Sequence, residues 1–169
     1  MGYVHDTQMA NFIQPMDFVM SAGTWTATIA SNLVSYDRTA ADASVTVLVP
    51  IRIPSNANAY KGAKLTSIDV NYSIATGAAD DFATVELEKC TLGANAVANA
   101  GAAVSVTIDA AHDTAAERKA IANHRMTITP ASPEFLDDDC CYWLQMVIDN
   151  AANTVLKFYG AVAHFTLRA

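Results

Sequence analysis

The sequence is short of charged residues and of long apolar runs, and both shortages limit what the protein can be. Charged side chains make up 16% of the 169 residues, against about 25% in an ordinary soluble domain. Mean hydropathy is +0.19, yet no run approaches the roughly 18 consecutive apolar residues of a transmembrane helix. We therefore expect no membrane as partner. The surface is either neutral and built of small residues, or covered by partner chains.

Basic residues are especially few. Ten Lys and Arg stand against 17 Asp and Glu, which gives a net charge of −7 and a pI near 4.8. Binding to nucleic-acid phosphates needs clustered basic side chains, and the one adjacent basic pair is Arg118-Lys119. We exclude nucleic acid as a partner. Residues 1–18 also lack a basic segment followed by an apolar core, so we expect synthesis in a cytoplasm without a signal peptide.

Motifs for catalysis and cofactor binding are missing. The sequence has no zinc-protease H-E-x-x-H, no nucleophile elbow, no P-loop and no dinucleotide fingerprint. The histidines are scattered rather than paired, and His164 is interpreted as an outward-facing or interface residue; the four are His5, His112, His124 and His164. We expect a protein that is not an enzyme and that holds no cofactor and no metal. Paired carboxylates from distant strands, as in glycosidases, stay open.

The sequence does contain a series of short β-type segments separated by Gly, Pro, Asn and Asp. Apolar residues alternate with polar ones most clearly over residues 64–76. Further strands are expected at residues 24–30, 44–54, 82–92, 103–109, 124–130, 142–149 and 154–168. The loops at residues 77–81 and 150–153 predict hairpins between the strands that they join. The predicted core includes Ile68, Val70, Tyr72, Val85, Leu87, Leu144, Met146 and Ile148.

One short helix is expected, on a connection at residues 114–123. Thr114 and Glu117 have the spacing of a capping box, and Asn123 is a plausible terminator. About eight strands with punctuated turns predict an all-β protein, an antiparallel β-sandwich of jelly-roll-like form. We place this sandwich domain at residues 22–169 and an N-terminal arm at residues 1–21.

The stretch EFLDDDCCYW (residues 134–143) is the best candidate for a chemical site. Adjacent residues of an extended segment point to opposite faces, so Cys140 and Cys141 do not readily share a metal. Acidic neighbours also raise the pKa of a thiol, which argues against a reactive cysteine. We interpret Asp137–Asp139 as a solvated turn, with one cysteine facing the core. A weak Ca²⁺ site at this turn and a disulfide from Cys90 to Cys140 or Cys141 stay open.

The N-terminal arm is too apolar for a free tail. Its apolar side chains precede the first β-type segment, and a monomer that exposed them would present an interaction patch. We predict that they form an assembly interface, made of Phe12, Ile13, Met16, Phe18 and Val19. The alternative is that the arm packs on its own domain.

Two segments together carry a resemblance: YKGAKLTSIDVNYSIATGAADDFATVELEK and PEFLDDDCCYWLQMVIDNAANTVLKFYGAVAHF. They resemble small β-sandwich structural proteins of tailed phages and related viruses, in strand pattern over about half of the chain. The resemblance implies a virion component such as a capsid decoration, head-fibre or tail protein, made in the host cytoplasm. It implies no catalytic residues. The expected partners are further copies of the chain, as a trimer, and a major capsid or other virion protein.

A carbohydrate-binding module or lectin is the leading alternative, because such modules share the fold class. They bind sugars through exposed aromatic side chains, and Trp25, Trp143 and six tyrosines are available. Trp143 is predicted to lie in the core. A glycan partner stays open.

Overall fold

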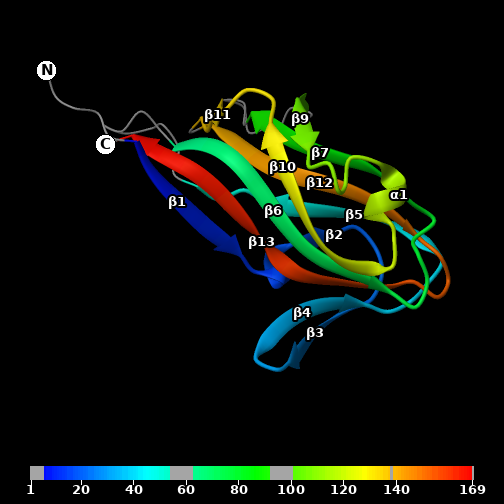
Figure 1. Cartoon of the computed structure of the whole chain (residues 1–169). Helices are drawn as coiled ribbons and strands as arrows, with labels where there is room; N and C mark the ends of the chain where they lie inside the picture. Colours follow the sequence, from blue (N-terminus) through cyan, green and yellow to red (C-terminus); the bar gives the residue numbers. More distant parts are fainter. Residues whose placement is uncertain (1–5, 54–62, 92–100, 138, 169) are drawn as a thin grey trace, which may run out of the picture.

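The computed structural model describes residues 6–53, 63–91, 101–137 and 139–168. The protein is all-β, with two antiparallel sheets packed face to face as a sandwich (Figure 1). The larger sheet has eight strands in the order β3-β4-β13-β6-β10-β9, with β1 beside β13 and β11 beside β6. These strands are β1 (Asp6–Ile13), β3 (Trp25–Ala30), β4 (Leu33–Arg38), β6 (Ala63–Ala75), β9 (Val106–Ile108), β10 (Ala122–Pro130), β11 (Glu134–Phe135) and β13 (Val155–Arg168).

The smaller sheet has five strands in the order β2-β5-β12-β7-β8. They are β2 (Val19–Met20), β5 (Ala43–Pro50), β7 (Asp81–Thr91), β8 (Ala102–Val104) and β12 (Cys140–Asn150). Two short helical segments lie on connections, the 3₁₀ turn η1 (Pro15–Asp17) and the helix α1 (Ala115–Arg118). In the described part of the chain, no helix has the length and apolarity to cross a membrane.

The strand order is that of a jelly roll, as expected. Strands β4-β13-β6-β10 of one sheet face β5-β12-β7-β8 of the other. The chain passes from sheet to sheet between β4 and β5, β5 and β6, and β6 and β7, and again between β12 and β13. This path is the eight-stranded double-sheet wrapping found in viral capsid and lectin domains. The remaining strands extend its sheets. The predicted set of about eight strands missed β4, and residues 103–109, predicted as one strand, form parts of β8 and β9 in different sheets.

The hairpins expected at residues 77–81 and 150–153 are absent from the described chain, and both segments cross between the sheets instead. The two crossings pack together. The hydroxyl of Thr154 donates to the carbonyl of Ala78 at 2.9 Å, and a Cβ on Gly77 would collide with the side chain of Asn153. Alternating strands around a polar turn look the same in both topologies, so the sequence pattern did not distinguish them.

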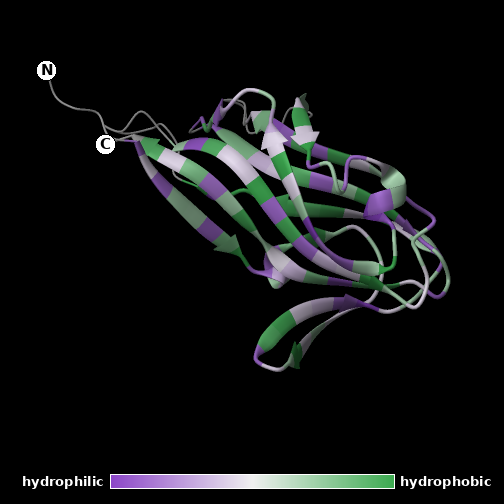
Figure 2. Cartoon of the chain, viewed as in Figure 1, coloured by the Kyte–Doolittle hydropathy of each residue, from purple (hydrophilic) through white to green (hydrophobic). Residues whose placement is uncertain are grey.

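The core lies between the sheets and confirms the predicted inward faces. Every predicted core residue is buried, and the fully buried side chains also include Phe82, Met126, Ile128 and Phe158. Figure 2 shows the matching alternation of hydrophobic and hydrophilic residues along the long strands. The helix α1 has the predicted capping box, since Thr114 and Glu117 bond each other's backbone N–H groups. It is shorter than the sequence predicted.

Residues 6–20 of the proposed arm belong to the sandwich in this structure. β1 pairs along β13 from Asp6 opposite Arg168 to Ile13 opposite Ala161. β2 pairs with β5 in the other sheet. The arm therefore crosses from one sheet to the other through η1, and the boundary at residue 21 separates no independent segment here.

The hairpin of β3 and β4 projects from the body of the sandwich (Figure 1). Its two-residue turn, Ser31-Asn32, has positive φ at both positions, as the favoured type I′ hairpin turn requires. Only Tyr36 and Asp37 of β4 pair with β13. The tip of the hairpin therefore extends past β13, away from the rest of the larger sheet.

Candidate functional site

The predicted assembly residues divide into two groups. Ile13 and Phe18 are 3% and 4% exposed and belong to the core of their own chain. Phe12, Met16 and Val19 are about half exposed, at 52%, 52% and 50%. We name these last three the β1–η1–β2 patch. It is the part of the predicted interface that another chain can reach.

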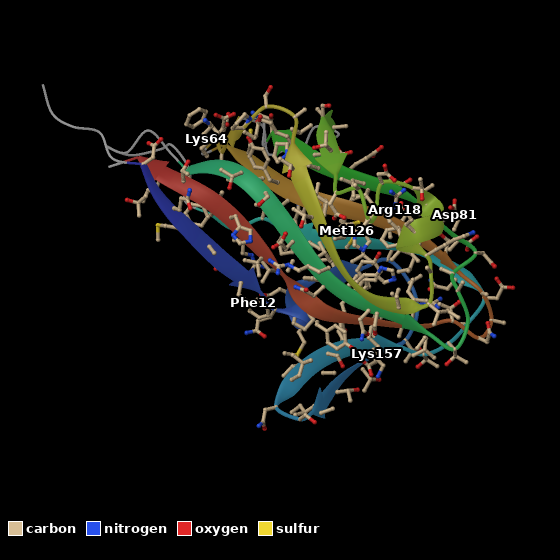
Figure 3. The ribbon with its side chains drawn as sticks, in the orientation of Figure 1. Phe12, Lys64, Asp81, Arg118, Met126 and Lys157 are labelled. Carbon is tan, nitrogen blue, oxygen red and sulfur yellow. The ribbon has the colours of Figure 1, made fainter. Side chains whose placement is uncertain are left out.

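The patch is held in place by close packing of β1 on β13. At Gly160 the backbone has φ +119°, and a Cβ there would meet the carbonyl oxygen of Ile13 and the ring of Phe12, each at 2.7 Å. The pairing between β13 and β6 shifts register between Phe158 and Gly160, as at a β-bulge. Figure 3 shows Phe12 at the end of β1 that leads into η1. The missing side chain at Gly160 thus leaves room for the Phe12 ring beside β13.

Two further apolar side chains are exposed on the projecting hairpin. Ile29 is 77% exposed and Leu33 is 52% exposed. They flank the Ser31-Asn32 turn, away from the pairing of β4 with β13. The base of β4 contacts η1, so the hairpin and the β1–η1–β2 patch lie at the same end of the molecule.

The stretch EFLDDDCCYW forms a corner between the sheets. Glu134 and Phe135 pair with β6 in the larger sheet, and Cys140 begins β12 in the smaller one. Leu136 is buried. Lys89 forms an ion pair with Asp137 and lies 3.6 Å from Glu134. The corner is thus fixed by a buried leucine and by a lysine between two carboxylates.

The corner brings together three groups that could face a metal ion. The ligand atoms of Asp137, Asp139 and Cys140 lie within 4.8 Å of one another. The Cys140 thiol donates to Asp139 at 3.3 Å, and its pKa is raised, chiefly by burial. A protonated thiol and a carboxylate already paired with Lys89 are poor ligands for Ca²⁺, which prefers several carboxylate and carbonyl oxygens. The proximity of these three groups is therefore not sufficient to indicate a metal site. Asp138 lies outside the described residues.

The cysteines take the predicted faces. Cys140 packs against the core, while Cys141 lies directly opposite Cys90 on the neighbouring strand β7. All three thiols are free. Burial and the neighbouring Cys141 raise the pKa of Cys90, so this thiol stays uncharged near neutral pH.

Trp143 is not in the core, contrary to the sequence prediction. In β12 the buried residues are Tyr142, Leu144, Met146 and Ile148, so Trp143 and Gln145 point to the outer face of the smaller sheet. There they line a hollow of about 350 Å³ together with Leu48, Glu88, Cys90 and Gly101. The strand period of two was read correctly, but the aromatic residue was placed on the wrong face. A tryptophan is amphipathic enough to lie at a surface.

His112 and His124 form a buried chain of polar contacts that the sequence analysis did not predict. The Nδ1 of His112 lies 2.8 Å from the Asp109 carboxylate, and its Nε2 lies 3.2 Å from Nδ1 of His124. The Nε2 of His124 faces the carbonyl of Ala120 at 2.9 Å. The ring of Tyr72 stacks on His124 with centroids 4.6 Å apart. The chain ends on a backbone carbonyl, so it presents no nucleophile to a substrate.

Arg118 is a buried cation held by backbone oxygens. Its guanidinium donates four hydrogen bonds of 2.8–3.1 Å, to the carbonyls of Phe82, Ala83, His112 and Asp113. Figure 3 shows it beside α1. Within the described residues no carboxylate forms an ion pair with it. The arginine therefore fastens the loop before α1 to the start of β7.

His164 lies on the outer face of the larger sheet, as interpreted from its place in the last strand. Its Nε2 is 3.1 Å from the carboxylate of Asp69. Asp69 is buried and also accepts from Arg125 and Thr127, at 2.6 and 2.7 Å. This polar cluster ties β6, β10 and β13 together across the sheet. His5 lies outside the described residues.

No local pattern in the sequence indicates the histidine pair, the buried arginine or the hollow beside Trp143. The histidines meet through the fold of the loop before α1, whereas Arg118 and the hollow depend on segments that are distant in the chain. Comparison with known proteins adds no relative: no protein-family model matches the chain, and no curated protein matches it. The fold and the geometry of these groups therefore carry the functional argument.

Proposed function

We propose that the protein is a non-enzymatic structural subunit of a virion or similar assembly, of the capsid-decoration, head-fibre or tail type. In this proposal it forms a homo-oligomer, a trimer, and docks on a capsid or other virion protein. The observation that carries the proposal is the β1–η1–β2 patch. Phe12, Met16 and Val19 are half exposed along the segment that joins the two sheets, on a chain with only 16% charged residues. Exposed apolar side chains that gather at one edge mark interaction surfaces.

The edge next to the patch supports assembly. β1 pairs with β13 alone in the described part of the chain, so from residue 7 to residue 12 the other side of β1 has no described strand beside it. Proteins that stay monomeric protect such edges with charge, proline or a bulge, and most of β1 is exposed. A neighbouring chain that covered this edge and the patch together would remove both from water. Closed symmetric assembly does this for every copy.

The chemistry of the interior supports a structural role. Asp109 and His112 are paired like the acid and base of a catalytic triad, but the Nε2 of His112 faces His124 rather than a serine or cysteine. The buried Arg118 faces carbonyls. The histidine pair and Arg118 thus connect the loop before α1 to neighbouring strands of the sandwich.

The proposal is tested by sedimentation velocity on the full-length chain at micromolar concentration. We expect one species whose mass is about three times 18.0 kDa. A single species at the mass of one chain contradicts the proposal.

Carbohydrate recognition is the second candidate function, and one observation favours it. Trp143 lies on the outer face of the smaller sheet beside Glu88 and Gln145, whose side chains bond to no described residue, and a sugar ring can reach it there. Jelly-roll domains serve both in capsids and as lectins, so the fold favours neither.

A further inference from the structure

The outer face of the five-stranded sheet is hollowed at its centre. The hollow has a volume of about 350 Å³ and is open to solvent along the face. This volume is at the lower end of the range for small-molecule sites, about 300–1,000 Å³. Trp143 of β12 lies directly opposite Glu88 of β7, and Gln145 lies opposite Leu48 of β5. Each of these side chains points outward by the period of its strand.

The lining combines apolar walls with polar groups that have no partner. Glu88 and Gln145 form no hydrogen bond or ion pair with any residue of the described chain. The rest of the lining includes the indole of Trp143, the side chain of Leu48 and the uncharged thiol of Cys90. The carboxylate of Glu88 packs close to Gly101, where a Cβ would lie 2.5 Å from its oxygen. The hollow offers one flat apolar wall, which is the indole. It also offers two acceptor groups, the Glu88 carboxylate and the Gln145 carbonyl, and one donor group, the Gln145 NH₂.

The charges of the lining select the class of ligand. Among the described residues that line the hollow there is one carboxylate and no lysine or arginine, and the whole chain carries a net charge of −7. Anionic ligands such as phosphates or acidic sugars are therefore repelled. A quaternary ammonium ion would be held by a cage of several aromatic rings, and the described part of the lining has a single aromatic side chain, Trp143.

We propose that this hollow is a binding site for a neutral saccharide. The C–H face of one sugar ring stacks on the indole of Trp143, and its hydroxyl groups bond to the Glu88 carboxylate and the Gln145 amide. Sugar rings match this lining because they carry an apolar face and a polar rim. Leu48 closes the side opposite Glu88. The inference deepens the second candidate function and does not depend on the proposed assembly.

The test is calorimetric titration of the full-length protein, kept reduced so that Cys90 and Cys141 stay as thiols. The probes are four neutral hexasaccharides: cellohexaose, mannohexaose, chitohexaose and maltohexaose. Trp143→Ala removes the stacking wall, and Glu88→Gln removes the charge while keeping the shape. The matched control is Glu86→Gln, because Glu86 lies on the same face of β7 but outside the lining of the hollow.

We expect at least one hexasaccharide to bind, and its affinity to fall about tenfold or more in Trp143→Ala. Glu88→Gln should weaken binding as well, whereas Glu86→Gln should leave it unchanged. The proposal is overturned if no hexasaccharide binds, or if both hollow variants bind as well as the parent. Binding of tetramethylammonium in place of the sugars also overturns it.

The same titration on Met16→Glu separates this inference from the assembly proposal. Val19 of the patch lies opposite Leu48 of the hollow, so a neighbouring chain could cover part of the site. Sugar binding by a Met16→Glu monomer supports the saccharide site whatever the oligomeric state of the parent. Loss of the oligomer without any sugar binding leaves assembly standing and removes the saccharide site.

Discussion

His112 and His124, twelve residues apart, face each other through Nε2 and Nδ1 at 3.2 Å. The outer nitrogens face the Asp109 carboxylate and the Ala120 carbonyl. Both of these partners are acceptors, so each outer nitrogen carries a proton and one more proton completes the bond between the rings. Two neutral rings hold two N–H protons, and a third between the facing nitrogens makes one of the rings an imidazolium. A fourth would set two N–H groups against each other.

Acid should therefore weaken the fold through this pair. Burial lowers the pKa of His124 below its ordinary 6.5, and the hydrogen bond to Ala120 offsets only part of that effect. An unfolded chain binds the proton near pH 6.5 while the folded chain resists it, so stability falls as pH drops below about 6.5. Electrostatic repulsion from His112 lowers the pKa of His124 further.

Thermal melting between pH 7.5 and about 5.5 checks this sign. The parent should lose melting temperature toward the acid end. His124→Gln keeps an amide N–H for the Ala120 carbonyl but cannot titrate, so its melting temperature should change less over the same range. Equal acid slopes for parent and variant would mean that the pair does not control the pH dependence. Asp109 affects stability only at a lower pH. Its pKa is lowered in the folded chain, so its contribution to folding stability is lost only as pH falls below about 4.

Removing the guanidinium of Arg118 should have a large effect on folding stability. Arg118→Met keeps the length of the side chain and removes the donors to four carbonyl groups. Leaving buried carbonyls without partners should lower the free energy of unfolding by about 3 kcal/mol. Lys119→Met is the matched control, because the neighbouring Lys119 donates one exposed hydrogen bond and should cost about 0.5 kcal/mol or less. Urea unfolding that gives the two variants the same midpoint would contradict this account of Arg118.

A substitution at Gly160 tests how closely β1 lies against β13. Gly160→Ala places a side chain at φ +119° and against Ile13 and Phe12, so the free energy of unfolding should fall by roughly 1–3 kcal/mol. Gly77→Ala is a milder change, since its new Cβ meets only the movable end of the Asn153 side chain. Melting curves in which Gly160→Ala is no worse than Gly77→Ala would show that β1 does not pack as described.

Chelation should have no effect on stability. The Asp137 carboxylate is paired with Lys89, and the raised pKa of Cys140 keeps its thiol protonated, so the corner at residues 137–140 is not prepared for a cation. Melting with EDTA, and then with excess Ca²⁺ or Zn²⁺, should give the same temperature. A rise of several degrees on adding either ion, lost in Asp137→Asn, would establish a metal site there.

The inward faces of the strands could be predicted because they depend on local alternation. Val70 and Leu144 are buried as expected, and the capping box of Thr114 was visible from spacing alone. The sheet to which each strand belongs could not be predicted, because a crossing and a hairpin leave the same turn residues. The jelly-roll wrapping was expected from the strand count rather than from any pairing.

The candidate sites were harder to predict than the fold. His112 approaches His124 only because the loop before α1 folds back on β10, and Trp143 meets Glu88 only because β12 and β7 are neighbours. For the arm, the sequence showed apolar residues but not their burial. Ile13 and Phe18 face the core, whereas Met16 does not, and no local pattern separates them.

The central claim is that copies of this chain assemble through the β1–η1–β2 patch. The most direct measurement is light scattering of the parent beside Met16→Glu, with Ile121→Glu as control, because Ile121 is equally exposed at 58% but lies outside the patch. We expect the parent and Ile121→Glu at about three times 18.0 kDa and Met16→Glu as a folded chain of 18.0 kDa. A parent that is itself monomeric, or a Met16→Glu variant that keeps the full mass, would contradict the claim.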